Sequence, residues 1–303
     1  MTNSTDNVFE SIPVGPEEAS LFHAFIADHD FSAATRRSFT LDVRKFAAWF
    51  AQANREPFVV SRVTVRDVAD FRDYLRREKG QAVATVNRCL VLVRRFFGWL
   101  TEEGHVAWNP AKKVKQLRRQ SLSPKGLDRS QVRSLFREVE LRNDVRANAI
   151  FSMFLYTGAR IGDLVHLQIH DLIINDRSGS VVYRHGKGGK QRTVPLPLAA
   201  RRALQTYTET RPPVEDDHVF VGERGRLRPA GYRSLCDKYT AIVGVKIHPH
   251  LLRHTFSHQY LSDNPGDLVG LAQILGHSSI STTAIYTQKN HEDLIAASDR
   301  VTY

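Results

Sequence analysis

The sequence predicts a mainly α-helical protein of two domains, the second of which also carries one small antiparallel sheet. Apolar residues recur at spacings of three and four along most of the chain, which is the period of a helix with one buried face. Residues alternate between apolar and polar in only one stretch, 179–196. The 303 residues exceed the length at which a single core is usual, and the 42% hydrophobic content is ample for two packed cores.

The first domain is expected to be a compact module of four helices over residues 17–108, after a flexible tail at 1–16. Thr64 has the sequence context of a helix start. Aromatic residues in the apolar stripes are interpreted as core residues, because that role is far commoner than cofactor binding. The stripes that define the four helices are Leu21, Phe22, Phe25 and Ile26; Leu41, Val43, Phe46, Ala47 and Phe50; Val68, Phe71 and Leu75; and Val86, Leu90, Val93, Phe97 and Leu100.

Residues 109–126 are interpreted as a basic linker. The apolar pattern fails between Asn109 and Arg133, and Asp128 is the only acidic residue there. A solvated linker would look similar, but the lack of acidic residues favours contact with a nucleic-acid backbone. The side chains expected to bind DNA are Arg36, Arg37, Arg44, Arg88, Arg94 and Arg95 in the first domain, Lys112, Lys113, Lys115, Arg118 and Arg119 in the linker, and Lys190 beyond it.

The second domain is expected to span residues 127–303. Asp128 or Ser130 can cap a helix that runs through Phe136. An apolar helix over 147–156 should end at Gly158, since glycine commonly ends helices. Residues 179–196 predict a β-hairpin with its turn at 188–189. Further helices are expected at 197–210, 229–242, 249–261, 267–275, 279–287 and 291–298.

Charge and composition point to a polyanionic partner. The formal net charge is +11, and neutralising phosphates releases counterions, which supplies most non-specific affinity for nucleic acids. The two cysteines, Cys89 and Cys236, lie one in each domain among apolar neighbours, which predicts buried free thiols. No signal-peptide core and no run of about 18 apolar residues is present, so we expect a cytoplasmic protein with no membrane partner.

Six polar residues of the second domain suit attack on a phosphodiester. Breaking this bond without a metal requires cations on the two non-bridging oxygens, and an arginine fork donates two parallel hydrogen bonds without losing its charge. Arg160 and Arg253 are placed in that role. The six residues are Arg160, Lys187, His250, Arg253, His277 and Tyr286.

Their local contexts strengthen this interpretation. The motifs are Thr157-Gly158-Ala159-Arg160, His185-Gly186-Lys187-Gly188-Gly189-Lys190, His250-Leu251-Leu252-Arg253, Leu275-Gly276-His277 and Thr282-Thr283-Ala284-Ile285-Tyr286. At these residues the chain resembles the tyrosine recombinase (phage integrase) family, and the resemblance extends from about Glu17 to Asp299. It implies a four-helix SAM-like core-binding domain followed by a mostly helical catalytic domain with a small antiparallel sheet.

The resemblance also implies a role for each residue. Tyr286 would be the nucleophile, and the bottom-up argument agrees, because a phenol must lose its proton as it attacks and needs a base or a dense positive field nearby. His250 is expected to accept that proton or to donate to the phosphate, and His277 to bind the phosphate. Lys187 is the expected general acid, with Lys190 as its rival, and Asp163 would orient Arg160 or a histidine.

The implied reaction needs no cofactor and no ATP. Tyr286 attacks DNA, forms a 3′-phosphotyrosyl bond and releases a 5′-hydroxyl. The 5′-hydroxyl of another strand later attacks this bond and rejoins the DNA. The implied DNA partner is a duplex with paired inverted-repeat core sites. The implied protein assembly is a homotetramer on DNA, with or without a paralogous recombinase, and its strand exchange proceeds through a Holliday junction. A C-terminal helix at 290–299 would pack into a neighbouring protomer or fold back on its own domain. With no large domain before Glu17, the chain resembles Xer-type and simple transposon or integron recombinases.

Three alternatives stay open. A metallohydrolase is suggested by His248, His250, His254 and His258, although no His-Glu-x-x-His motif accompanies them. A catalytically inactive DNA-binding scaffold of the same fold would lack one of the six residues, and none is missing. A type IB topoisomerase shares the chemistry but needs no exchange helix.

Overall fold

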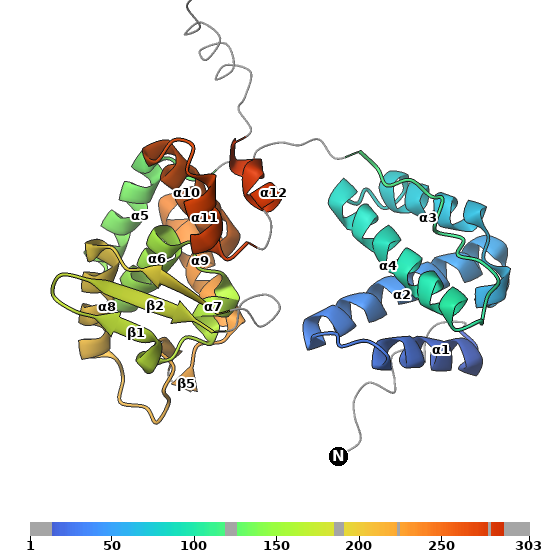
Figure 1. Ribbon diagram of the computed structural model, residues 1–303, viewed down its shortest axis with the longest axis horizontal. Helices are drawn as coiled ribbons and strands as arrows, with labels where there is room; N and C mark the ends of the chain where they lie inside the picture. The colour runs from blue at the N-terminus through green and yellow to red at the C-terminus, as the bar shows by residue number, and fades with distance from the viewer. Residues whose placement is uncertain (1–13, 119–125, 185–190, 223–224, 278–279, 288–303) are drawn as a thin grey trace, which may run out of the picture. The chain divides into compact units, whose positions relative to one another are not determined.

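The computed structural model describes residues 14–118, 126–184, 191–222, 225–277 and 280–287 (Figure 1). The chain divides into two compact units, Met1–Ser121 and Leu122–Tyr303. Each unit has its own hydrophobic core, and the main core cluster of one shares no residue with that of the other. The expected mainly helical fold with a small antiparallel sheet in the second half is confirmed.

The first unit contains the four expected helices. Two of them begin where side chains satisfy the first free backbone N–H groups: the Ser32 hydroxyl accepts from the backbone of Thr35, and Thr64 forms a capping box with Asp67. The elements of this unit are α1 (Pro16–Ala27), α2 (Ala33–Asn54), a 3₁₀ turn (Val60–Arg62), α3 (Val65–Arg77) and α4 (Val83–Glu102).

Aromatic side chains fill the core of the first unit, as the stripes predicted. Phe25 is completely buried and meets Phe96 edge-on, with ring centroids 5.3 Å apart. Such edge-to-face packing is favourable because ring edges are positive and ring faces negative. Leu41 is an exception to the predicted stripes, since 56% of it is exposed. It lies on the outer face of α2, where the stripe of Val43 and Phe46 does not reach.

Residues 109–118 belong to the first unit and are hydrogen-bonded to α4. The Asn87 side-chain amide both donates to and accepts from the backbone of Leu117. The Arg94 guanidinium donates to the carbonyl oxygens of Ala111 and Val114. The first part of the predicted linker is therefore hydrogen-bonded to α4. Both Nε and Nη2 of Arg94 are used in these structural contacts.

The second unit is built mainly from helices whose ends follow ordinary capping rules. Asp128 caps α5, and Gly158 ends α6 with φ +61° in the left-handed region. The α5 helix continues past Phe136, because Leu135 and Val139 extend its buried stripe. The helices are α5 (Arg129–Leu141), α6 (Val145–Thr157), α7 (Ile161–Val165), α8 (Leu198–Thr210), α9 (Pro229–Val243), α10 (Pro249–Asp263), α11 (Leu268–Leu275) and α12 (Ile280–Thr283).

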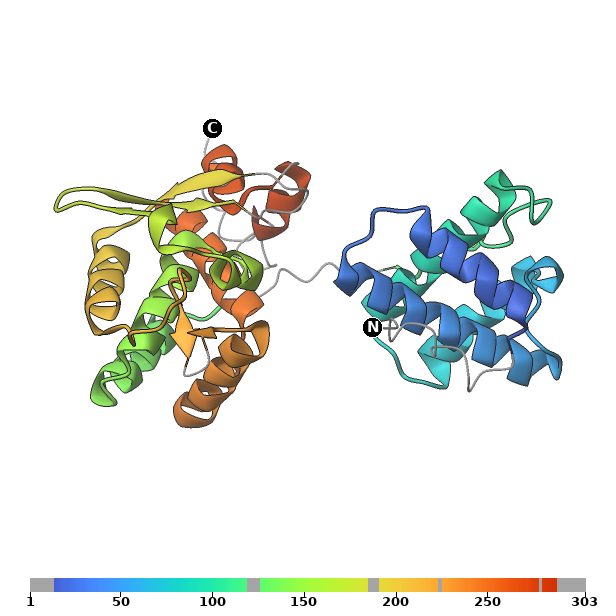
Figure 2. The same cartoon turned by 90° about the horizontal axis from the view of Figure 1, so that it is seen from below.

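The alternating stretch at 179–196 forms the expected antiparallel pair, and a third strand completes the sheet. The order is β1-β2-β3, with β1 (Leu172–Ile174), β2 (Gly179–Tyr183) and β3 (Arg192–Pro195). Val181 pairs with Val194, and both are buried. The predicted turn at 188–189 lies outside the described residues. In the view of Figure 2 the sheet (yellow-green) lies along one side of the helices of this unit.

Several short elements were not expected from the sequence. These are α7, strand β1, a 3₁₀ turn (Ile169–Asp171) and a two-stranded ribbon of β4 (Val221–Gly222) and β5 (Gly225–Arg226). The helix expected at 279–287 is instead the short α12 followed by a 3₁₀ turn, Ala284–Thr287. Elements of two to five residues are too short to establish a periodic pattern, which explains why they were missed.

Both cysteines are buried free thiols, as predicted. In the described part of the chain, no helix is long and apolar enough to cross a membrane.

Candidate active site

The end of α6 positions Arg160. Gly158 lets the chain turn there, and a Cβ at this position would come within 2.5 Å of the Phe256 ring. Glycine is thus required by the backbone angle and by the close packing of α10 against this turn. The backbone N–H of Arg160 donates to Asp163 Oδ2 at 2.7 Å, which begins α7. The Arg160 side chain consequently starts from a fixed backbone.

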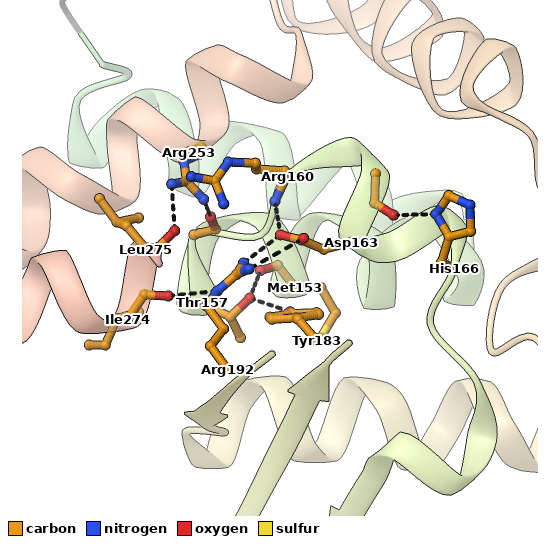
Figure 3. A network of polar contacts seen from close by, with 12 residues as sticks. Met153, Thr157, Arg160, Asp163, His166, Tyr183, Arg192, Arg253, Ile274 and Leu275 are labelled. Atoms are coloured by element: carbon orange, nitrogen blue, oxygen red, sulfur yellow. Dashed lines mark hydrogen bonds and ion pairs between the residues drawn. The ribbon is translucent and has the colours of Figure 1, made fainter. Parts of the chain in front are cut away.

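Arg253 is held in the same place from α10. It is 4% exposed, and its guanidinium donates to the carbonyl oxygens of Gly158 and Leu275. Burial, followed by the charges of Arg160 and Arg192, lowers the pKa of Arg253 to about 9. This value is still above neutral pH, so the group stays cationic. Figure 3 shows the guanidinium groups of Arg160 and Arg253 next to each other.

His277 joins this group after α11. Its Nε2 lies 3.0 Å from Nη2 of Arg253, and its Nδ1 lies 2.8 Å from the hydroxyl of Thr283. Because a guanidinium only donates, Nε2 must accept, and Nδ1 then carries the proton of a neutral ring. Burial and the charge of Arg253 lower the pKa of His277 to about 4, which agrees with a neutral imidazole.

Asp163 pairs with a residue that the sequence analysis did not single out. The carboxylate is 5% exposed and forms an ion pair with Arg192 of β3 (Figure 3). Arg192 also donates from Nε to the carbonyl oxygen of Ile274 at 3.0 Å, and its guanidinium lies 4.5 Å from the ring centre of Tyr183. Asp163 was expected to orient Arg160 or a histidine. It contacts the backbone of Arg160, but the guanidinium it holds is that of Arg192, because β3 brings that side chain to it.

Tyr286 lies on the 3₁₀ turn that follows α12. It is 7% exposed and belongs to a small apolar cluster with Phe256, Leu271 and Leu275. Its hydroxyl lies 2.9 Å from Nδ1 of His254. The nucleophile predicted from the sequence is therefore packed against α10 with its hydroxyl in a defined hydrogen bond.

The histidine that contacts Tyr286 is not the one expected. His250, His254 and His258 are spaced four residues apart and share one face of α10. His250 is exposed and makes no hydrogen bond with the described residues, whereas His254 reaches the Tyr286 hydroxyl. Sequence reasoning had considered His254 only as a zinc ligand. Its spacing of one turn from His250 was the available signal, but the packing of the 3₁₀ turn decides which ring meets the phenol.

The described residues contain no group of three or more side chains arranged to hold a metal ion. The zinc alternative therefore has no structural support in that part of the chain. The rings of His254 and His258 instead lie against Tyr286, with centroids 5.5 and 5.4 Å from its ring.

The electrostatics of the site favour an anion. Burial lowers the pKa of Arg160, and its Nη1 atom is buried with no hydrogen-bond partner in the described structure. Among the described residues, Arg160, Arg192 and Arg253 all interact with the carboxylate of Asp163. An unpaired buried donor costs free energy, and a phosphate oxygen is the acceptor that a guanidinium fork fits best.

The remaining predicted residues are distributed as follows. Lys187, Lys190, Arg119 and the helix expected at 290–299 lie outside the described residues. In the first unit, Arg88 pairs with the buried Asp42, and Arg95 stacks over the ring of Phe31 at 4.7 Å. The predicted DNA-binding residues that are exposed in the structure are Arg36, Arg37, Arg88, Arg95, Lys112, Lys113, Lys115 and Arg118.

Sequence comparison places this arrangement among known proteins. Residues 125–293 match the model of the phage integrase family, and residues 20–104 match that of the phage integrase N-terminal SAM-like domain. The chain is 32% identical to tyrosine recombinase XerC of Thermodesulfovibrio yellowstonii over 285 residues, which cover 89% of this chain and 90% of that protein. It is 29% identical to tyrosine recombinase XerD of Listeria monocytogenes, covering 88% of this chain and 91% of the relative.

Solved structures share the fold. The XerH site-specific recombinase bound to a palindromic difH substrate, in a post-cleavage complex, has a TM-score of 0.75 at 18% identity, covering 93% of this chain and 84% of that chain. A lambda integrase dimer bound to a core site has a TM-score of 0.71 at 15% identity, covering 90% of this chain and 95% of that one.

Proposed function

This chain belongs to the phage integrase family and is a tyrosine site-specific recombinase, and from that premise we propose that it cleaves and rejoins DNA through a 3′-phosphotyrosyl bond to Tyr286. The charges of both Arg160 and Arg253 interact with Tyr286. The proposal thus assigns the nucleophile to a phenol on which the charges of both arginines act.

The observation that carries the proposal is the unpartnered, buried Nη1 of Arg160 beside the cationic Arg253. A scissile phosphate placed there would receive hydrogen bonds from both guanidiniums on its non-bridging oxygens. These oxygens gain negative charge in the transition state, so the interactions strengthen as the reaction proceeds. Because the donors are held by backbone carbonyls and by packing, little reorganisation is needed when DNA binds.

The proposed reaction has two reversible steps. The Tyr286 oxygen attacks phosphorus, its proton leaves, and the bond from phosphorus to the 5′ oxygen breaks. Lys187 protonates the departing 5′ oxygen. The 5′-hydroxyl of another strand then reverses these steps, and because the phosphotyrosyl ester preserves the bond energy, no ATP is consumed. His277 and His250 are proposed to bind the phosphate. His277 would first give up its hydrogen bond with Arg253 and form one with the phosphate instead.

The proposed assembly follows that of recombinases acting on paired sites. Residues 17–108 and 127–303 would form a clamp around the duplex, joined by the basic stretch 109–126, with four protomers exchanging strands through a Holliday junction. Helix 290–299 would link neighbouring protomers. The DNA-bound complexes of XerH and of lambda integrase support a duplex partner, as does the formal charge of +11.

The experiment that tests this function begins with a pool of nicked duplexes of randomised sequence, incubated with the protein in EDTA. DNA that becomes covalently attached is recovered from a denaturing gel and sequenced, and the modified residue is mapped by mass spectrometry. We expect an adduct at Tyr286 that is lost in Tyr286→Phe and kept in the matched control Tyr260→Phe, whose hydroxyl donates to Asp267. An adduct at another residue, or none, contradicts the proposal.

A further inference from the structure

The hydrogen bond between His254 and Tyr286 has no role in the reaction as described so far. His254 is half-buried in the middle of α10, and its Nδ1 lies 2.9 Å from the Tyr286 hydroxyl. The two rings are also in contact, with centroids 5.5 Å apart at 55°. The imidazole is thus fixed against the oxygen atom that the proposed function makes the nucleophile.

Among the described residues, the other groups of the site are less suited to take the Tyr286 proton. Arg160 and Arg253 carry only donors and keep their charge. The ring nitrogens of His277 are both engaged, one by Arg253 and one by Thr283. The ring of His258 lies perpendicular to the phenol ring, with centroids 5.4 Å apart. The lone pair of His254 Nδ1 is therefore the acceptor that the described structure offers to this hydroxyl.

We infer that His254 is a catalytic residue that accepts the Tyr286 proton at Nδ1 as the phosphotyrosyl bond forms and returns it when the strand is rejoined. The inference rests on the proposed function. The bond from Tyr286 Oη to hydrogen breaks and the bond from Oη to phosphorus forms, while the phosphorus bond to the 5′ oxygen breaks and Lys187 supplies that oxygen's proton. One proton enters His254 and one leaves Lys187, so each cleavage is balanced and each rejoining reverses it.

The surroundings of His254 link its basicity to DNA binding. Burial, followed by the charges of His250, His258 and Arg253, lowers the pKa of His254 to about 4, so the ring is neutral at pH 7 with its lone pair available. A phosphate between Arg160 and Arg253 would offset the positive field that disfavours protonation. His254 becomes a stronger base when the substrate is in place and leaves Tyr286 protonated when it is not.

The first test needs no DNA. Nitrogen-15 NMR of the full chain, with the His254 signals assigned by comparison with His254→Asn, reports which ring nitrogen is protonated. We expect an unprotonated Nδ1 and a protonated Nε2 at pH 7, so that the phenol donates to the imidazole. A protonated Nδ1 would make His254 the donor to Tyr286 and would overturn the inference.

The second test measures cleavage of the nicked duplex recovered with the wild-type protein. In His254→Asn the amide oxygen can still accept a hydrogen bond but is not basic, so adduct formation should slow by about 10²–10⁴-fold, the usual contribution of a general base. His258→Asn is the matched control on the same helix face and should slow it less than tenfold. Imidazole added to His254→Ala should restore part of the rate.

A substrate with sulfur in place of the scissile 5′ oxygen separates the two proton transfers, because a thiolate leaves without being protonated. On this duplex Lys187→Ala should approach the wild-type rate while His254→Asn stays slow. If His254→Asn also recovers, His254 protonates the leaving group and the inference is wrong. A His254→Asn protein that cleaves both duplexes at the wild-type rate overturns only the inference, whereas absence of any wild-type adduct overturns the proposed function with it.

Discussion

Asp42 in the first unit and Asp163 in the second are both buried, and their charges are neutralised differently. In the first unit Asp42 is 1% exposed and pairs with Arg88, whose side chain is 46% exposed, while Lys45 lies 3.7 Å away. In the second unit Asp163 pairs with Arg192, which is 8% exposed. Two further buried or half-buried guanidiniums adjoin that pair.

The difference shows which of the two sites has all of its charges hydrated or paired without a ligand. Around Asp42 the cations reach solvent, so any excess charge is hydrated at little cost. Around Asp163 the guanidiniums are withdrawn from water, and Nη1 of Arg160 has no partner in the described structure. The first arrangement braces two helices, and the second needs an anion to be satisfied. This contrast between the Asp42 pair and the Asp163 site leads to four predictions.

The largest expected effect is on catalysis when the unsatisfied cation is removed. Arg160→Met should slow adduct formation on the recovered duplex by about 10²–10³-fold or more, in line with about 3 kcal/mol for a lost transition-state donor. The melting temperature of the second unit should not fall, because the change relieves repulsion with Arg253. The control is Arg142→Met, which removes a surface ion pair with Glu138 on α5. Cleavage near the wild-type rate in Arg160→Met would mean that the arginine serves the fold.

The next effect is on the stability of the first unit. Arg88→Met leaves the buried Asp42 carboxylate without its main partner and should lower the free energy of unfolding by about 3 kcal/mol. Adding Asp42→Leu should recover most of that loss. All three tryptophans, Trp49, Trp99 and Trp108, lie in this unit, so urea unfolding followed by tryptophan fluorescence reports on it alone. Equal losses in the single and double variants would contradict the pairing argument.

A smaller effect is expected from pH. The folded-state pKa values of His254 and His277 are lowered to about 4, whereas unfolded histidine titrates near 6.5. The unfolded state therefore binds more protons between these values, and the second unit should lose stability as pH falls through 6.5 towards 4. Allowing for partial exposure, we expect about 1 kcal/mol for each histidine. Calorimetry from pH 7 to 4 measures this loss, and His277→Gln should reduce it; an unchanged slope would refute the assignment.

The smallest effect is anion binding without DNA. Inorganic phosphate should raise the melting temperature of the second unit, because a ligand at ten times its dissociation constant adds about 1.4 kcal/mol to the free energy of unfolding. Arg160→Met at the same phosphate concentration controls for general salt effects and should show a smaller rise. An identical rise in melting temperature in both proteins would show that phosphate does not bind at Arg160.

Long helices were the part of the fold that the sequence predicted well. The helices through Phe46 and Phe97 carry enough apolar repeats to fix both their existence and their buried face. Short elements such as α7 and β1 carry too few residues for any period: α7 begins where Asp163 binds the backbone of Arg160, and β1 is held by pairing with β2. Leu41 was misplaced for a related reason: spacing identifies a stripe, but only packing shows where its edge lies.

The candidate site divides in the same way. By itself the sequence singled out Arg160, Arg253 and Tyr286, because side-chain type fixes charge and reactivity, and it predicted the helix end at Gly158 that precedes Arg160. Tertiary structure decided the partners: Asp163 with Arg192, 29 residues apart, and Tyr286 with His254, 32 residues apart. Such pairings depend on how separate helices and strands pack, to within the few tenths of an ångström that a hydrogen bond allows, and no local pattern in a chain encodes that distance.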